Sequence, residues 1–257
     1  MLKPLIHRVA DRFGVRILGK GHYLLLQEDM EPEFQAIYPR CKAYTMTHIE
    51  RMYALYNAVR YVMAAGIPGA LVECGVWRGG SAMMMAETLK AGGDVSRVLY
   101  LYDTYEGMSK PTARDITSGN VSPFKWFQFS DHQDYAVEEN MGLSLAVPLE
   151  AVRQNMERTG YPLENIRLVK GKVEDTLPGV VPDQIALLRL DTDWYESTYQ
   201  EMLHLYPRLA RGGVLILDDY GFWKGSREAV DQYFAENGVK MLLNRVDHGC
   251  RIGIKID

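Results

Sequence analysis

The sequence contains little cysteine and no long apolar run. Its three cysteines, Cys41, Cys74 and Cys250, lie far apart, and no CxxC pair is present. Neither a disulfide framework nor a zinc site is therefore indicated. No stretch approaches the roughly 18 apolar residues that a membrane helix needs, and the first residues lack the apolar core of a secretory signal. We expect a protein of the reducing cytoplasm that does not enter a membrane.

An excess of basic residues is also missing. The 257 residues include 29 Lys and Arg against 33 Asp and Glu, a net charge of −4. Because nucleic-acid-binding domains are usually basic, we expect no nucleic-acid partner. The hydrophobic fraction of 47% is typical of a folded globular chain. The length fits a single α/β domain with insertions, and the sequence leaves open whether the chain forms a homo-oligomer.

Short apolar runs alternate with segments of helical periodicity from Thr47 onwards. Strands are expected at residues 70–74, 98–102, 166–169, 185–190, 214–217, 239–243 and 251–256. Helices are expected from Thr47 to before Gly66, and at residues 81–91, 148–158, 195–209 and 227–236. Such alternation predicts a parallel sheet with helices on both faces. Only residues 244–250 separate the last two strands, which is too short for a helical crossover, so this pair is expected to be antiparallel.

The predicted fold is therefore a single α/β domain over residues 1–257, with a mostly parallel seven-stranded sheet and one antiparallel strand. Two segments depart from the alternation. Residues 1–46 form an N-terminal extension without a clear pattern. Residues 107–147 are aromatic-rich, include Trp126, and have no clear period. Loops this long are usually functional lids or disordered, and the aromatic content argues against disorder, so we expect a lid. His132 in this segment is a candidate proton acceptor.

A glycine-rich turn follows the first predicted strand, where doubly wound folds bind their ligands. It consists of Glu73-Cys-Gly-Val-Trp-Arg-Gly-Gly-Ser81. The dinucleotide pattern GxGxxG fails because Trp77 stands at the second glycine, and the phosphate-loop pattern fails because Ser81 replaces its lysine. The turn is close to the S-adenosylmethionine loop of methyltransferases. A tight strand-to-helix turn that binds no ligand is the alternative.

Two further acidic positions extend this half of the predicted site. Asp103 ends the second strand, where a carboxylate can accept the hydroxyls of a ribose. Glu174 and Asp175 follow the third strand, on the side where such folds approach an adenine ring. Each of these acids is equally compatible with an ordinary solvated turn residue, so the prediction rests on their occurrence together with the glycine-rich turn.

Four carboxylates follow the next two parallel strands. Asp191 and Asp193 end the strand at 185–190, and Asp218 and Asp219 end the strand at 214–217. Neighbouring parallel strands bring these groups together, and like charges that close resist ionising. A bound cation resolves the conflict, and oxygen ligands favour Mg²⁺, Mn²⁺ or Ca²⁺ over zinc. Alternatively, Asp193 and Asp219 cap the helices that follow.

The Asp191-x-Asp193 pattern has two other interpretations. A phosphatase of the haloacid-dehalogenase type would need DxDxT, but Tyr195 stands at the threonine position. A metal-dependent glycosyltransferase with a DxD motif remains a rival. It gives no reason for the glycine-rich turn or Asp103. A non-catalytic module that binds an adenosyl ligand is the second rival.

Several of these motifs together resemble the macrocin O-methyltransferase family. They are Thr45-Met46, Val72-Glu-Cys-Gly-Val-Trp-Arg-Gly-Gly-Ser81, Leu190-Asp-x-Asp193 with Tyr195-Glu-Ser-Thr198, and Gly212-Gly213 leading to Asp218-Asp219-Tyr220. The resemblance runs from about residue 44 to residue 234. Enzymes of this family methylate sugar hydroxyls in macrolide and aminocoumarin antibiotic biosynthesis.

The resemblance implies a class I methyltransferase fold, S-adenosylmethionine as the methyl donor, and a Mg²⁺ ion held by Asp191, Asp218 and Asp219. The residues expected to bind the donor are Thr45, Met46, Glu73, Gly75, Trp77, Arg78, Gly79, Ser81, Asp103, Gly171, Glu174 and Asp191. The candidates for the catalytic base are Asp191, Asp193 and His132. Family members carry a lid histidine shortly before a Leu-Ala-Val stretch; here Leu145-Ala-Val147 has no histidine immediately before it, and His132 lies further upstream.

The expected reaction is methyl transfer to a hydroxyl of a sugar or glycosylated small molecule, either a natural product or a polysaccharide precursor. Three carboxylates leave positions open in the near-octahedral shell of Mg²⁺. A vicinal diol can fill two of them. We therefore predict an acceptor with two adjacent hydroxyls, of which one is methylated.

Overall fold

The computed structural model describes residues 29–123, 125, 137–138, 142–143, 146–177 and 179–256. It divides the chain into two units, residues 1–36 and 37–257, and the division falls within helix α3 (Pro32–Cys41). In the described part of the first unit, the Gln35 side chain donates a hydrogen bond to the Met30 carbonyl. The site described below lies entirely in the second unit.

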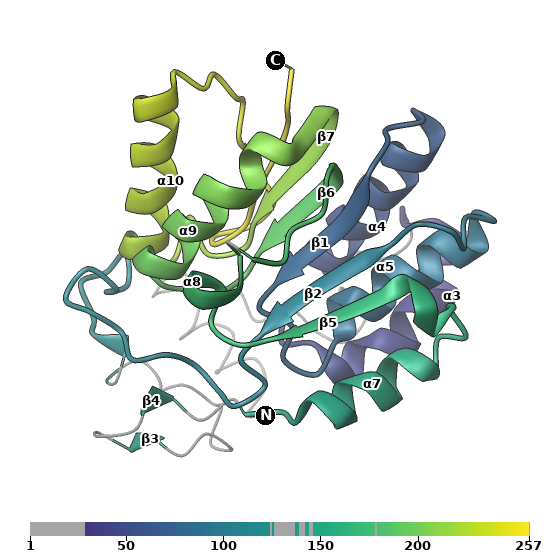
Figure 1. Ribbon diagram of the computed structural model, residues 1–257, viewed down its shortest axis with the longest axis horizontal. Coiled ribbons are helices and arrows are strands. Elements are labelled where there is room, and N and C mark those ends of the chain that lie inside the picture. The colour runs from purple at the N-terminus through teal and green to yellow at the C-terminus, as the bar shows by residue number, and fades with distance from the viewer. Residues whose placement is uncertain are drawn as a thin grey trace, which may run out of the picture. The chain divides into compact units, whose positions relative to one another are not determined.

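A seven-stranded sheet forms the centre of the second unit (Figure 1), with the strand order β5-β2-β1-β6-β7-β9-β8. The strands are β1 (Ala70–Cys74), β2 (Leu99–Asp103), β5 (Ile166–Lys170), β6 (Ile185–Leu190), β7 (Leu209–Leu217), β8 (Asn244–Arg245) and β9 (Arg251–Ile254). The first five in this order are parallel, whereas β9 is antiparallel to both β7 and β8. The predicted mostly parallel sheet with one reversed strand is confirmed.

Helices cover both faces of the sheet (Figure 1). One face carries α4 (Ile49–Ala64), α5 (Gly80–Ala91) and α7 (Leu149–Glu157), and the other carries α8 (Val173–Thr176), α9 (Tyr195–Leu205) and α10 (Lys224–Asn237). The remaining elements are the short 3-10 helices η1 (Lys42–Tyr44), η2 (Leu163–Asn165) and η3 (Tyr206–Arg208), and the paired strands β3 (Val137–Glu138) and β4 (Gly142–Leu143).

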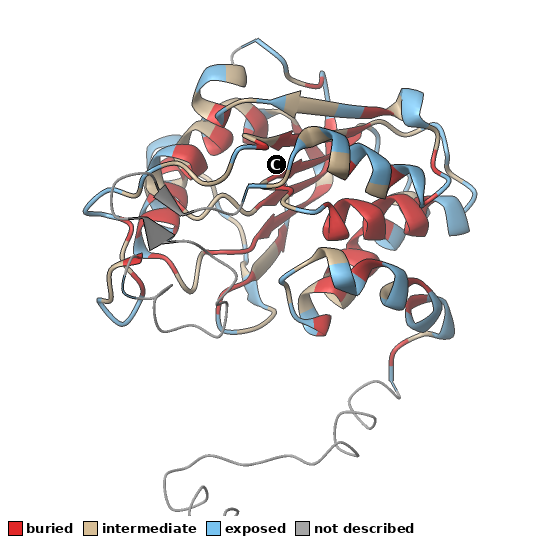
Figure 2. Ribbon diagram, turned by 90° about the horizontal axis from the view of Figure 1, so that it is seen from below, coloured by how far each residue is buried: buried red, intermediate tan, exposed pale blue. Residues whose placement is uncertain are grey.

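The core lies between these layers, and the central strands are the most buried part of the chain (Figure 2). Every residue of β1 and of β6 is buried, as expected for strands covered on both faces. Among the described residues, none of the helices combines the length and the hydropathy that crossing a bilayer requires.

Three predicted elements differ from the structure, one of them the strand expected at residues 214–217, which already begins at Leu209. The helix expected to reach residue 209 ends at Leu205, because Pro207 follows and cannot continue it. The strand expected at residues 239–243 does not form there; the edge strand that pairs with β9 is β8, at Asn244–Arg245. Alternate apolar residues in 239–243, such as Met241, pack against the core without joining the sheet. An alternating apolar pattern at this position therefore reflects burial against the core, although the same pattern is typical of a strand.

Candidate active site

A pocket of about 350 Å³ opens at the carboxyl ends of the parallel strands. The hydrogen-bond ladder continues one residue beyond these ends: Asp191 N–H donates to the Cys74 carbonyl and Asp218 N–H to the Leu190 carbonyl, each at 2.9 Å. Gly75 N–H donates in the same way to the Tyr102 carbonyl. The first residues of the site are thus positioned by the sheet itself.

The glycine-rich turn needs its glycines because other backbone segments pack directly against it. Gly75 has φ +84°, and a Cβ there would lie 1.9 Å from the Asp191 carbonyl oxygen. A Cβ on Gly80 would lie 2.6 Å from the Tyr44 carbonyl and 2.7 Å from the Thr45 side chain. These contacts bring the turn against the carboxylate segment on one side and against residues 44–45 on the other.

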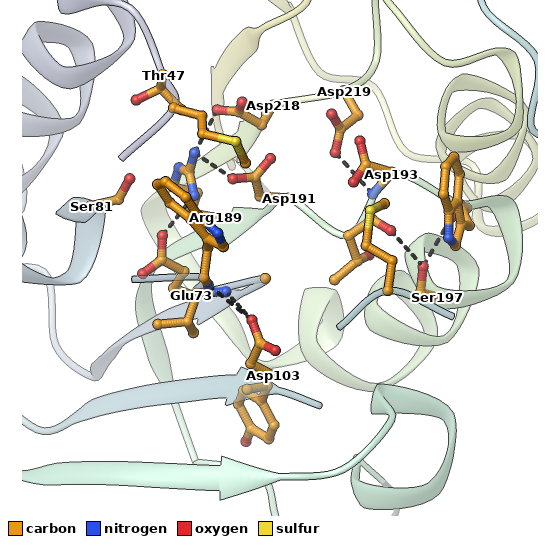
Figure 3. A pocket seen from close by; sticks show the side chains of 18 of the residues that line it. Thr47, Glu73, Ser81, Asp103, Arg189, Asp191, Asp193, Ser197, Asp218 and Asp219 are labelled. Carbon is orange, nitrogen blue, oxygen red and sulfur yellow. Dashed lines mark hydrogen bonds and ion pairs between the residues drawn. The ribbon is translucent and has the colours of Figure 1, made fainter. Parts of the chain in front are cut away.

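Asp103 holds the turn from below (Figure 3). Its Oδ2 accepts the backbone N–H groups of Val76 and Trp77 at 2.7 and 3.0 Å, and its Oδ1 accepts that of Tyr105 at 2.8 Å. A carboxylate offers about four acceptor positions, and the fourth is met only by the Thr104 hydroxyl at 3.4 Å, a long contact that a ligand hydroxyl would replace. In the structure it already fixes the conformation of the turn.

Most residues expected to bind the donor line this pocket. They are Thr45, Met46, Glu73, Gly75, Trp77, Ser81, Asp103, Gly171, Glu174 and Asp191. Arg78 and Gly79 do not line it: Arg78 is exposed and its guanidinium lies 4.5 Å from the centre of the Trp77 ring, and Gly79 caps α5 with φ +88°. For these two residues the structure favours a role in the turn rather than contact with the donor.

The three carboxylates predicted to bind metal meet at the adjoining end of the pocket. Asp191, Asp218 and Asp219 each offer an oxygen, and these oxygens lie within 4.8 Å of one another. The side chains of Asp218 and Asp219 are buried, while that of Asp191 is 27% exposed. Oxygen donors at this spacing suit a hard cation such as Mg²⁺.

Two arginines balance part of the negative charge of this cluster. Arg189 donates from Nη2 to Asp191 Oδ2 and Asp218 Oδ1, both at 2.8 Å, and from Nη1 to Glu73 Oε1 at 2.6 Å. Figure 3 shows Arg189 between Glu73 on one side and Asp191 and Asp218 on the other. Arg51, on α4, contacts the remaining oxygen of Asp218. The cluster is therefore partly neutralised by the chain's own cations.

Burial and mutual repulsion make these acids hard to ionise. Desolvation is the main cause that raises the pKa of Asp191 and of Asp219 well above the ordinary value, and the neighbouring carboxylates raise both further. Burial also raises the pKa of Asp193 to about 7, with added repulsion from Asp191. Glu73 has a pKa raised to about 7 by burial, opposed by Arg189. A divalent cation would relieve the repulsion among these groups.

Asp193 lies beside Asp219 rather than facing solvent as a simple helix cap. It has φ +69°, its backbone N–H donates to Asp219 Oδ2 at 3.1 Å, and its Oδ1 accepts the Trp223 indole N–H at 2.5 Å. Thr192, which separates Asp191 from Asp193 in the sequence, donates its hydroxyl hydrogen to the fully buried Glu201 at 2.9 Å. The segment that carries Asp191 and Asp193 is therefore held from both sides.

The beginning of the predicted lid, residues 107–123, is attached to α9 and α10. Buried Asp115 accepts the Tyr195 backbone N–H at the start of α9 at 2.7 Å. The Trp194 indole donates to the Ser109 carbonyl at 2.9 Å, and Ser109 lines the pocket. His132, the candidate base in the lid, lies outside the described residues.

Sequence reasoning missed Arg51, Arg189 and the residue that anchors Arg51, Asp247. Arg51 Nε donates to Asp247 Oδ2 at 2.7 Å, and Asp247 lies in the turn between β8 and β9. A signal existed for Arg189, since a lone charge inside a fully buried strand must have a partner. No spacing in the sequence connects Arg51 with residues nearly 200 positions away.

The fold and the site define the class: the chain has the fold of class I S-adenosylmethionine-dependent O-methyltransferases. The structure of the O-methyltransferase NovP matches with a TM-score of 0.69 and 31% identity, covering 83% of each chain. The calicheamicin methyltransferase CalS11 matches with a TM-score of 0.63 over 90% of this chain and 89% of its own, and at 17% identity this supports the fold alone.

The chain belongs to the macrocin O-methyltransferase (TylF) family, whose model matches residues 28–252. It is 38% identical over 210 residues to the 8-demethyl-8-(2,3-dimethoxy-alpha-L-rhamnosyl)-tetracenomycin-C 4'-O-methyltransferase of Streptomyces olivaceus, covering 80% of this chain and 73% of that one. It is 33% identical, with the same coverage, to the demethyldecarbamoylnovobiocin O-methyltransferase of Streptomyces niveus. The chain is therefore an S-adenosylmethionine-dependent O-methyltransferase, and the glycosyltransferase and binding-module hypotheses are set aside.

Proposed function

We propose that this O-methyltransferase is Mg²⁺-dependent and methylates a sugar hydroxyl of a glycosylated small molecule. The observation that carries the metal dependence is the group of Asp191, Asp218 and Asp219, whose oxygens lie within 4.8 Å of one another. The sugar acceptor is supported by family membership and by relatives such as the rhamnosyl-tetracenomycin enzyme.

The pocket brings the two reactants together along one wall. When bound, S-adenosylmethionine supplies the methyl group and Mg²⁺ supplies positive charge that makes a nearby hydroxyl more acidic. Glu73, Ser81 and Asp103 would hold the donor on the side of the glycine-rich turn. The carboxylate cluster would orient the acceptor on the other side. The two sites adjoin each other, because Gly75 packs directly on Asp191. Positioning of this kind contributes on the order of 7–11 kcal/mol at best.

Asp191 would accept the proton of the acceptor hydroxyl. It is the carboxylate of the cluster that adjoins the glycine-rich turn and stays 27% exposed. Asp193, with a pKa raised to about 7 by burial, is the second candidate. His132 remains a prediction for the lid.

The lid, residues 107–147, would cover the acceptor. Its described beginning already contributes Gly107, Met108 and Ser109 to the pocket wall. The contacts of Asp115 and Ser109 with the start of α9 connect this wall to the carboxylate segment. These contacts would fix the position of an acceptor held by the lid relative to the carboxylates.

Metal dependence is tested by turnover in a chelator. We expect excess EDTA to abolish methyl transfer to a glycoside acceptor and added Mg²⁺ to restore it, while S-adenosylmethionine binding measured by calorimetry changes little. Full turnover in excess chelator would remove the metal from the mechanism and leave Asp191 as a simple base.

The acceptor's shape is tested by a deoxy analogue. We propose that the true acceptor presents two adjacent hydroxyls to the carboxylates, since three carboxylates do not fill the Mg²⁺ shell. Removing the hydroxyl that is not methylated should lower kcat/KM by a factor equivalent to at least about 2–3 kcal/mol of transition-state stabilisation, because that group fixes orientation. Equal rates for the acceptor and its deoxy analogue would exclude the paired-hydroxyl arrangement.

A further inference from the structure

The arginine Arg51 contacts one of the carboxylates that are proposed to bind metal. Arg51 lies on α4, and its Nη1 contacts Asp218 Oδ2 and the Asp218 carbonyl, the latter at 3.2 Å. Its Nε donates to Asp247 at 2.7 Å. Arg189 takes the other oxygen of Asp218. Both oxygens of a carboxylate proposed to bind Mg²⁺ are therefore engaged by guanidinium groups.

The two arginines are held differently. Arg189 is 3% exposed and is fixed by three acids, Glu73, Asp191 and Asp218. Arg51 has a side chain that is 13% exposed, lines the pocket, and reaches Asp218 from a helix outside the strand ends. Of the two, Arg51 is the one that can yield its place.

The charge of Arg51 reaches the whole cluster. Beyond its contact with Asp218, it stabilises the ionised forms of Asp191 and Asp219 electrostatically. A cation placed among these carboxylates and a divalent metal ion oppose each other, and at short range in a partly buried site that repulsion is only weakly screened. Because both oxygens of Asp218 are already engaged by guanidinium groups, a metal ion bound to Asp218 would compete with one of them.

The β8–β9 turn keeps Arg51 in this place. Asp247 accepts the backbone N–H groups of Gly249 and Cys250 at 2.8 and 2.7 Å and the Arg51 Nε–H with its other oxygen. A Cβ on Gly249 would lie 2.5 Å from Arg51 Nη2. The turn thus fits closely around the guanidinium and directs it toward Asp218.

We propose that Arg51 is a built-in counter-cation of the carboxylate cluster that competes with the divalent metal, so that the metal binds only after Arg51 gives up Asp218 Oδ2. This inference rests on the proposed Mg²⁺ dependence. Its consequence is that removing a positive charge near the site tightens metal binding in the enzyme without donor or acceptor. The guanidinium holds the cluster together until the metal arrives and weakens the metal's affinity.

The test is the affinity for Mn²⁺ alone, measured by electron paramagnetic resonance of free Mn²⁺ at pH 8 on the full chain. Arg51→Gln should bind Mn²⁺ at least tenfold more tightly than the wild type. Arg51→Lys keeps the positive charge but loses the planar guanidinium group, and its Mn²⁺ affinity should stay closer to that of the wild type. Arg153→Gln removes the same charge from exposed α7 and should change the affinity less than twofold.

The outcomes separate this inference from the proposed metal dependence. Mn²⁺ binding to the wild type with equal or weaker binding to Arg51→Gln would overturn the role of Arg51 and leave the metal dependence standing. Absence of binding to both, with turnover in chelator, would overturn both. If Arg51→Gln does not fold, Mg²⁺ titration of the wild type followed by solvent exchange of the Arg51 Nη1 protons, measured by NMR, decides: faster exchange supports release from Asp218, and unchanged exchange contradicts it.

Discussion

The two halves of the pocket are organised by different forces. On the side of β1, β2 and β5, the glycine-rich turn is shaped by backbone geometry, through Gly75, Gly80 and the backbone N–H groups that Asp103 accepts. On the side of β6 and β7, the arrangement depends on charge, with buried carboxylates held against Arg189 and Arg51. Steric fit therefore governs the donor half, and electrostatic balance governs the carboxylate half. Substitutions that change charge and those that change shape should act on different halves.

The largest effect is expected for Asp219→Asn, which removes one charge while keeping the shape. Turnover should fall about a thousandfold, equivalent to about 4 kcal/mol of transition-state stabilisation. Donor affinity, measured by calorimetry, should change less than threefold because Asp219 lies in the charge-governed half. Asp231→Asn, an exposed substitution of the same kind on α10, is the control and should retain full activity. A parallel loss of donor affinity and turnover in Asp219→Asn would show that the halves are not separable.

The second prediction tests one of the contacts between the two halves. Gly75→Ala introduces a Cβ 1.9 Å from the Asp191 carbonyl at a positive φ. Strain and overpacking together should lower the free energy of unfolding by roughly 3–4 kcal/mol, measured by denaturant titration. Gly66→Ala, also at positive φ but with nothing within 4 Å, serves as the control and should lose only the smaller strain contribution. Equal losses in the two variants would exclude the packing contact as the cause.

The third prediction concerns the pH dependence of stability without metal. Burial raises the pKa of Asp193 to about 7, so the folded protein binds a proton that the unfolded chain releases near pH 4. The stability that this group contributes is present below about pH 4 and is lost as the pH rises through about 7. Asp193→Asn should therefore gain stability relative to the wild type between pH 5 and pH 8, on the order of 2 kcal/mol.

The measurement is denaturant unfolding of both proteins in excess chelator across that pH range. A difference between the two that stays constant with pH would mean that Asp193 is ionised throughout. Addition of Mg²⁺ should reverse the comparison, because the ion favours the ionised wild type.

The smallest effect is expected for the shape-governed half. Asp103→Ala should weaken S-adenosylmethionine binding at least tenfold, about 1.4 kcal/mol, through loss of a ribose contact and of the hold on Val76 and Trp77. Asp103→Asn keeps an oxygen that accepts from the turn, and its S-adenosylmethionine affinity should lie between those of the wild type and Asp103→Ala. Mn²⁺ affinity should not change in either variant. Unchanged donor affinity in Asp103→Ala would remove this residue from the donor site.

What the sequence predicts depends on whether a feature is set by local pattern or by long-range contacts. The order of strands and helices, the glycine-rich turn and the four aspartates were predictable, because each depends on a local pattern at a strand end. Arg51 was not, because its partner Asp247 is 196 residues away and only the fold brings them together. Residues 239–243 show a third case, in which core burial imitates a strand. Shape is encoded locally, whereas charge balance depends on long-range packing.

The ladder that continues past the strand ends has a consequence for engineering this enzyme. Hydrogen bonds from Gly75, Asp191 and Asp218 to neighbouring strands make the spacing between the donor turn and the carboxylates a property of the sheet. Exchanging residues 107–147 or the β8–β9 turn between relatives therefore leaves that spacing in place. We therefore expect exchanges in these segments to change the acceptor while the sheet preserves the alignment that methyl transfer requires.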